Sequence, residues 1–151
     1  MARFLRQLRS FFAGFIQYRR FRRPPDAVEE LTRYIFSKSH FSQTSNRIKP
    51  AAFLPAPSPV ETSVFRMNSL AVSKVQRLGQ QLGARRSQTL HAWASVLAGA
   101  VFGIGLQVRP DNRPARHAAI MGWPEEKHER LTLAQQLAAA AALHLPSKEG
   151  I

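Results

Sequence analysis

The chain has 151 residues, 44% of them hydrophobic, which is enough for one domain with a buried core. Its 22 Lys and Arg residues against nine acidic ones give a formal net charge of +13, which favours nucleic acid, an anionic membrane face or a phosphate-bearing ligand as partner. The absence of cysteine excludes disulfides, thiol catalysis and cysteine-based zinc sites.

Residues 1–25 carry seven arginines and no acidic side chain. Apolar side chains recur there at alternating spacings of four and three, which predicts one apolar stripe on a helix. These are Phe4, Leu8, Phe11, Phe15 and Tyr18. We expect a basic amphipathic arm that adds electrostatic affinity for a polyanion. The alternatives are a helix that lies on an anionic membrane surface or docks on a partner protein, a mitochondrial targeting segment, or an extension without function.

The apolar run from Phe11 to Ile16 is shorter than the core of a secretory signal, and no small-residue cleavage site follows it. We therefore expect a cytoplasmic or otherwise intracellular protein, with peripheral membrane binding or mitochondrial targeting as alternatives. Pro24 and Pro25 end the arm, because proline lacks the amide donor of a helix. Residues 26–151 are expected to form a single α+β domain.

The domain is predicted to begin with a helix. Asp26 can cap it, and Val28, Leu31 and Ile35 would share one helical face. Residues 37–46 are polar and show neither helical nor alternating apolar spacing. This stretch is expected to be a surface loop that presents side chains.

Two short strands and a helix are expected next. Residues 48–54 and 60–67 are apolar runs separated by the sequence PAPSP, which is typical of strands joined by a proline-rich connection. Ser73 can cap a helix over residues 74–82, and Gly83 would end it.

The uncharged stretch 90–106 contains three glycines. Its small alternating side chains predict a buried strand, a glycine-rich turn and a return strand, with a buried helix as the alternative. A membrane span is disfavoured because seventeen residues is at the lower limit for crossing a bilayer and the glycines dilute the hydrophobicity.

The last third of the chain reads as a turn over residues 109–114 and a strand over 116–123. Pro124 is expected to open a helix, and a terminal alanine-rich helix is expected over 132–143. Helices that flank short strands predict a small α+β fold rather than a doubly wound sheet.

A His-x-Ser triplet, His40 to Ser42, stands in the predicted polar loop close to Lys38. An imidazole, a hydroxyl and a nearby cation suit a phosphoester site. The triplet looks like one half of the pattern in two-histidine phosphoesterases. The second half is missing, since neither His91 nor His117 is followed two places on by a hydroxyl, and the chain is not assigned to that family. The alternative is a solvated loop histidine without chemistry.

A second group of candidate residues is the basic turn that runs into the helix at Pro124. Arg113, Arg116 and His117 could bind an anion there, and Trp123 could stack on a base, unless Trp123 is a core side chain. Arg66 on a predicted strand could clamp a phosphate or carboxylate, the alternative being an outward, solvated side chain.

The leading hypothesis is a small basic domain that binds nucleic acid or another phosphate-rich ligand. The alternative is a non-catalytic interaction protein or membrane-surface adaptor that acts through residues 1–25. For an enzyme, phosphodiester chemistry is expected, with His40 and His117 as acid and base, Arg66 and Arg116 as anion-stabilising groups, and Lys38, Ser42, Arg113 and Trp123 as ligand contacts. No metal or cofactor is expected, and serine hydrolase chemistry lacks its Gly-x-Ser-x-Gly elbow.

Overall fold

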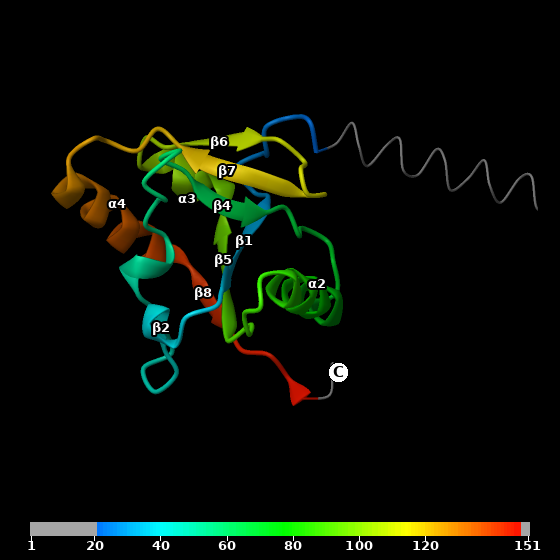
Figure 1. Cartoon of the computed structure of the whole chain (residues 1–151). Coiled ribbons are helices and arrows are strands. Elements are labelled where there is room, and N and C mark those ends of the chain that lie inside the picture. The colour runs from blue at the N-terminus through cyan, green and yellow to red at the C-terminus, as the bar shows by residue number, and fades with distance from the viewer. Residues whose placement is uncertain (1–20, 149–151) are drawn as a thin grey trace, which may run out of the picture.

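Six strands form one antiparallel sheet in the computed structural model, which describes residues 21–148 (Figure 1). In chain order they are β1 (Glu30–Ile35), β4 (Thr62–Phe65), β5 (Ala92–Leu97), β6 (Gln107–Pro110), β7 (His117–Met121) and β8 (Ala142–His144). They lie side by side in the order β6-β7-β4-β1-β5-β8. The predicted α+β class is confirmed. Residues 1–20, which hold most of the predicted amphipathic arm, are outside the described part of the chain.

Three helices are present among the described residues: α2 (Val72–Arg85), α3 (Ala98–Gly103) and α4 (Lys127–Ala140). Two 3-10 turns, η1 (Lys38–His40) and η2 (Pro50–Ala52), flank a two-stranded hairpin made of β2 (Phe41–Ser42) and β3 (Arg47–Ile48). In Figure 1, α2 lies on one side of the sheet and α4 on the other. Within residues 21–148, no helix combines the length and the apolar character that crossing a membrane requires.

The helix predicted from Asp26 is wrong, because this segment forms the interior strand β1. Every residue of β1 is paired with β5, from Glu30 opposite Leu97 to Ile35 opposite Ala92. Leu31 and Ile35 enter the core on one face, while Thr32 and Tyr34 are buried on the other. Burial on both faces masks the alternation that would identify a strand in the sequence. Val28, which the helix would have buried, is 80% exposed.

The sheet separates two cores. The larger one lies between the sheet and η2, α3 and α4, and includes Phe53, Val64, Ile120 and Leu137. The smaller one lies under α2. It is built from Tyr34, Phe65, Met67, Val75, Leu90 and Trp93. Successive residues of β4, Val64 and Phe65, therefore enter different cores, as period-two alternation requires.

Helix α2 approaches the sheet closely at Gly79. A Cβ atom there would lie 2.4 Å from the Tyr34 ring and 2.9 Å from Leu90. The Tyr34 hydroxyl donates to the carbonyl of Val75 at 2.6 Å, and burial raises the pKa of this phenol. The helix continues past Gly83, where the sequence predicted its end. Its N-cap residue is Ala71, so the predicted Ser73 cap is also wrong.

Other boundaries predicted from the sequence also differ from those in the structure. The strand expected over 48–54 ends at Ile48, because the proline of η2 starts a 3-10 turn. The stretch 90–106 contains β5 as predicted, but its glycine-rich middle is the short helix α3. The two helices expected near the C-terminal end are one helix, α4, whose first amides are capped by the carboxylate of Glu126. These two hydrogen bonds also lower the pKa of Glu126.

Candidate functional site

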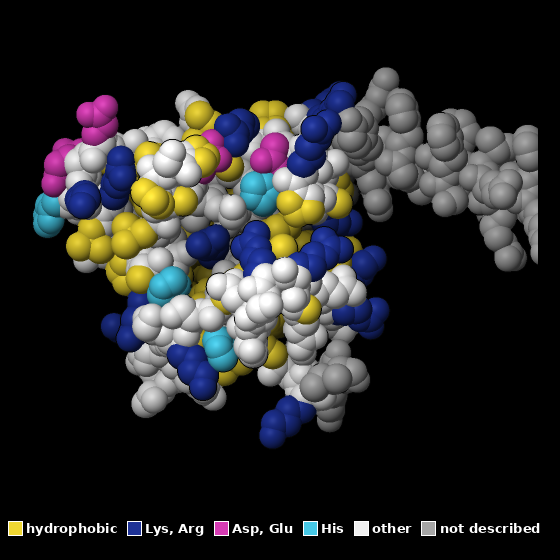
Figure 2. Space-filling model, in the orientation of Figure 1, with side chains coloured by type: hydrophobic (Ala, Val, Ile, Leu, Met, Phe, Trp, Pro, Cys, Tyr) yellow, Lys and Arg dark blue, Asp and Glu magenta, His cyan; other side chains and the backbone are white. Residues whose placement is uncertain are grey.

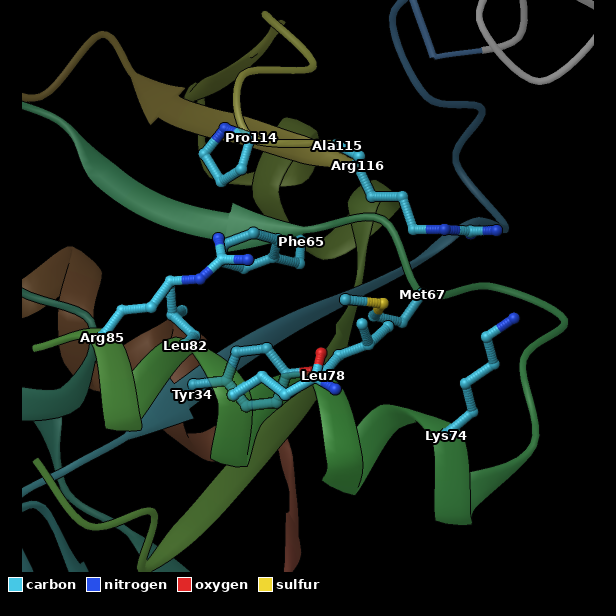
Figure 3. Close-up of a pocket in the computed structure, with 11 residues that line it drawn as sticks. Tyr34, Phe65, Met67, Lys74, Leu78, Leu82, Arg85, Pro114, Ala115 and Arg116 are labelled. Atoms are coloured by element: carbon cyan, nitrogen blue, oxygen red, sulfur yellow. The ribbon is translucent and has the colours of Figure 1, made fainter. Parts of the chain in front are cut away.

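A pocket of about 340 Å³ lies between α2 and the loop that joins β6 to β7 (Figure 3). Tyr34 and Phe65 form its aromatic floor, with ring centroids 5.6 Å apart. Three apolar side chains extend this floor: Met67, from the segment after β4, and Leu78 and Leu82, from α2. Pro114 and Ala115, from the β6–β7 loop, close the opposite side. The site is therefore assembled from strands, a helix and a loop that are distant in the sequence.

Three cationic side chains border this apolar floor. Lys74 and Arg85 come from the two ends of α2, and Arg116 immediately precedes β7. Figure 3 shows Arg85 on one side of Phe65, and Lys74 and Arg116 on the other. Helix α2 contains no acidic residue, and neither Lys74 nor Arg85 forms an ion pair with any residue from 21 to 148. The pocket therefore combines an apolar interior with a positive border.

The same charge pattern is visible on the molecular surface. In Figure 2, Lys and Arg side chains form a band across the middle of this face, between α2 and the strands β4 and β7. The acidic side chains visible in that view lie over the β6–β7 region and near the start of α4, away from α2. Positive charge is thus gathered beside the pocket.

Arg116 is held at the border by its backbone and by its side chain. Its φ of 71° is in the left-handed region, and its amide donates to the Asn112 side chain at 2.7 Å. Its guanidinium donates to the carbonyl of Arg66 at 3.1 Å and lies 4.7 Å from the centroid of the Phe21 ring. These contacts fix the position of the guanidinium at the border, and Arg116 as an anion contact stays a prediction.

Arg66 is inside the protein, so the solvated alternative considered for it is wrong. Its side chain is 2% exposed and donates to both carboxylate oxygens of Glu29, at 2.7 and 3.0 Å. It also donates to the carbonyl of Arg23, and its guanidinium lies 5.3 Å from the centroid of the Phe21 ring. The side chain therefore fastens residues 21–29 to the end of β4, and its engagement by Glu29 does not support the predicted ligand clamp.

His117 projects from β7 onto the face of the sheet that α2 partly covers. Its Nδ1 lies 2.7 Å from a carboxylate oxygen of Asp111, and its Nε2 lies 3.1 Å from the hydroxyl of Ser63. The imidazole is half-buried and meets the Phe65 ring edge-on, with centroids 5.3 Å apart. His117 therefore adjoins the pocket through Phe65 and belongs to a three-residue polar network.

His40 lies in η1, beside η2, which packs against α4. Partial burial and the positive charge of Arg33 lower the pKa of His40 below its ordinary value. Arg33 itself donates to the carbonyls of Ala52 and Ser63, at 2.8 and 2.9 Å. Burial and the charge of Arg86 lower the pKa of Arg33 to about 10. His40 thus belongs to the α4 side of the sheet, and the structure does not bring it into the network of His117.

The remaining predicted contacts are dispersed. Trp123 is 8% exposed and donates to the carbonyl of Ile120 at 3.1 Å, so it is the core side chain of the alternative interpretation. Arg113 is exposed in the β6–β7 loop, but it does not line the pocket. Lys38 is exposed in η1, and the hydroxyl of Ser42 accepts from the amide of Ser45 at 3.3 Å. Neither lines the pocket.

Sequence reasoning missed the four residues that define the pocket, namely Tyr34, Phe65, Lys74 and Arg85. A usable signal existed along α2, where Lys74, Leu78 and Arg85 share one face without an acidic neighbour, but the predicted end of the helix at Gly83 left Arg85 outside it. Comparison of the chain with models of protein families, with curated proteins and with solved structures gives no match. No cluster of three His, Asp or Glu side chains suitable for a metal ion occurs in residues 21–148.

Proposed function

We propose that this protein binds single-stranded nucleic acid, with one base in the pocket beside α2 and the neighbouring phosphates on its cationic border. The observation that carries the proposal is the aromatic floor of Tyr34 and Phe65 bordered by Lys74, Arg85 and Arg116. Aromatic contacts with bases contribute about 1–3 kcal/mol per base, and they tolerate any sequence because every base has a π-face. Cations that follow the backbone supply the rest of the affinity.

The shape of the site favours a single strand over a duplex. A volume of about 340 Å³ is at the lower end of the range for small-molecule pockets, roughly 300–1,000 Å³, and suits one planar group. A base reaches such a pocket when it is unstacked, as in single strands and loops. A duplex keeps its bases stacked and would contact the cations alone.

The test is a binding titration over a salt series. A fluorescent oligonucleotide of about 12 nucleotides would be titrated with the full chain, as RNA and as DNA, and followed by anisotropy. The double variant Lys74→Ala/Arg85→Ala should reduce the slope of log affinity against log salt by about 1.4, because two phosphate contacts are lost from a single strand. The variant Leu78→Trp should fill the pocket, weakening binding while leaving that slope unchanged.

The matched control is the double variant Arg47→Ala/Lys127→Ala. It removes the same charge from exposed positions on β3 and α4, on the other side of the sheet. If this control weakens binding as much as Lys74→Ala/Arg85→Ala does, net charge rather than the pocket explains the affinity. A duplex that binds more tightly than the single strand would also contradict the proposal.

The membrane-surface alternative, which acts through residues 1–25, is tested by a separate measurement. A truncated chain should begin at Phe21, because this residue is 6% exposed and lies against Arg66 and Arg116. Binding to anionic vesicles that disappears on this truncation, without oligonucleotide binding by the remaining chain, would favour the adaptor over the nucleic-acid proposal.

A further inference from the structure

Ser63, His117 and Asp111 form a continuous hydrogen-bonded series next to the pocket. The hydroxyl of Ser63 is 3.1 Å from Nε2 of His117, whose Nδ1 is 2.7 and 2.9 Å from the two carboxylate oxygens of Asp111. Serine, imidazole and carboxylate in this order are recognised as a catalytic group by their geometry, whatever their order in the chain. We propose that Ser63 is the nucleophile of a site that hydrolyses carboxylic esters.

The sheet and the β6–β7 loop fix the three groups. Ser63 and His117 lie on neighbouring strands, with Phe65 directly opposite His117, so the two side chains emerge on the same face. The amides of Asp111 and Asn112 both donate to the carbonyl of His117, which folds the loop back onto β7. The amide of Arg113 donates to the Asp111 carboxylate at 3.0 Å. The acid is thus held against the imidazole by backbone contacts.

Each group has a defined role in the proposed reaction. With Nδ1 of His117 donating to Asp111, Nε2 is left to accept the Ser63 proton as Oγ attacks the ester carbonyl carbon. Collapse of the tetrahedral intermediate breaks the bond to the leaving alkoxide, which takes the proton from His117. Water then attacks the acyl-serine and loses a proton to His117. The carboxylic acid product is released as Ser63 takes that proton back from His117. Water is the only co-reactant, and nothing is oxidised or reduced.

The positive surroundings suit the charge that this reaction develops. The oxyanion of the intermediate would form close to Phe65, toward which Arg85 extends from α2 (Figure 3). A cation near a developing oxyanion lowers the barrier because it attracts the transition state more than the neutral ester. The substrate class follows from the lining of the pocket: an ester with an apolar part and an anionic group, the latter held by Lys74 or by Arg85.

The same sheet face offers an internal control. The hydroxyl of Ser95 lies 2.8 Å from Nε2 of His144, and this imidazole stacks on Trp93 with ring centroids 5.5 Å apart. No carboxylate in residues 21–148 bonds to His144. Ser95 therefore has a histidine partner without the acid that orients it, and it should react far more slowly than Ser63.

The experiment treats the full chain with a fluorophosphonate probe and locates the adduct by peptide mass spectrometry. We expect labelling at Ser63, no labelling in Ser63→Ala, and unchanged labelling in Ser95→Ala. Asp111→Asn should slow labelling by roughly 100- to 10,000-fold, since it favours the wrong imidazole tautomer. Circular dichroism of each variant shows whether it folds. If Ser63→Ala does not fold, the slower labelling of Asp111→Asn is the second test.

Turnover tests the substrate class. The 4-nitrophenyl ester of a dicarboxylic acid, with one free carboxylate, should be hydrolysed faster than 4-nitrophenyl butyrate, and Lys74→Ala/Arg85→Ala should abolish that preference. An unlabelled wild type, or labelling at Ser95 instead of Ser63, would overturn the inference. Absent labelling alongside salt-dependent oligonucleotide binding overturns the ester site alone. Labelling of Ser63 without oligonucleotide binding overturns the nucleic-acid proposal alone.

Discussion

Two Arg–Glu pairs with the same chemistry but different burial allow a direct test of what holds the N-terminal edge of the domain. The Arg66–Glu29 pair has side-chain exposures of 2% and 10%, whereas the Arg109–Glu61 pair has 48% and 19%. Both are bidentate, with N–O distances of 2.7 and 3.0 Å in the first pair and 2.8 and 2.9 Å in the second. The ion pairs themselves therefore differ chiefly in burial.

We predict that Glu29→Ala lowers the free energy of unfolding by about 3–5 kcal/mol, because it leaves the Arg66 guanidinium in the interior without its counter-ion. Glu61→Ala should cost less than about 1 kcal/mol, since water solvates Arg109 once the carboxylate is gone. At roughly 3 °C per kcal/mol for a chain of this size, the midpoints of thermal unfolding should fall by about 9–15 °C and by less than about 3 °C, respectively.

The assay is urea unfolding followed by circular dichroism and by fluorescence of the buried Trp93 and Trp123. The apolar double variant Glu29→Leu/Arg66→Met should be more stable than Glu29→Ala, because neither charge is then left in the interior. If Glu29→Ala and Glu61→Ala are equally stable, within about 1 kcal/mol of wild type, burial does not decide the contribution of these pairs and the reasoning is refuted.

Two further predictions concern packing and pH. Gly79→Ala would gain about 1 kcal/mol of helix propensity, but the new Cβ atom would stand 2.4 Å from the Tyr34 ring, so a net loss of up to about 2 kcal/mol is expected in urea unfolding. Gly103→Ala, with no atom within 4 Å of the new Cβ, is the control and should be neutral or stabilising. Burial and Arg33 lower the pKa of His40 from 6.5, so protonation favours the unfolded chain; this contribution to stability is complete above pH 6.5 and is lost as the pH falls through the folded value. NMR titration should give a pKa below 6.5 for His40, and a pKa above 6.5 would contradict the burial argument. The variant His40→Gln should lose less stability than the wild type as the pH falls.

The sequence correctly predicted the elements whose pattern of apolar residues fits only one kind of secondary structure. The strand predicted over 60–67 contains β4, the strand over 116–123 contains β7, and the helix over 74–82 lies inside α2. Helix α2 buries one face and exposes the other, so its period is legible, whereas β4 and β7 are short apolar runs bounded by proline or glycine. Strand β1 is buried on both faces, and its apolar residues at positions 31, 34 and 35 fit a helix as well as a strand. Only the pairing with β4 and β5 decides between them, and pairing is not a local property.

Of the candidate site, the sequence predicted only residues that lie at the edge of the pocket. Arg116 and His117 were predicted as site residues because a basic turn runs into the helix expected at Pro124, and the structure places both beside the pocket. The hydrogen bond between Ser63 and His117 joins residues 54 positions apart and depends on the pairing of β4 with β7. No local sequence motif predicts that Ser63 and His117 meet, since the serine lies on a strand and not in the Gly-x-Ser-x-Gly elbow that serine hydrolases often use.

The position of the site follows from how unevenly α2 covers the sheet. On β1 and β5 the face beneath α2 carries Tyr34 and Trp93, and the helix buries both. On β4, β7 and β6 the same face carries Ser63, His117 and Arg109, while the opposite face sends Val64, Ile120 and Val108 into the larger core. An antiparallel sheet can leave one face in water when the other supplies the core. The polar half of this face therefore contributes little to either core, and Lys74 and Arg85 from the two ends of α2 lie beside it.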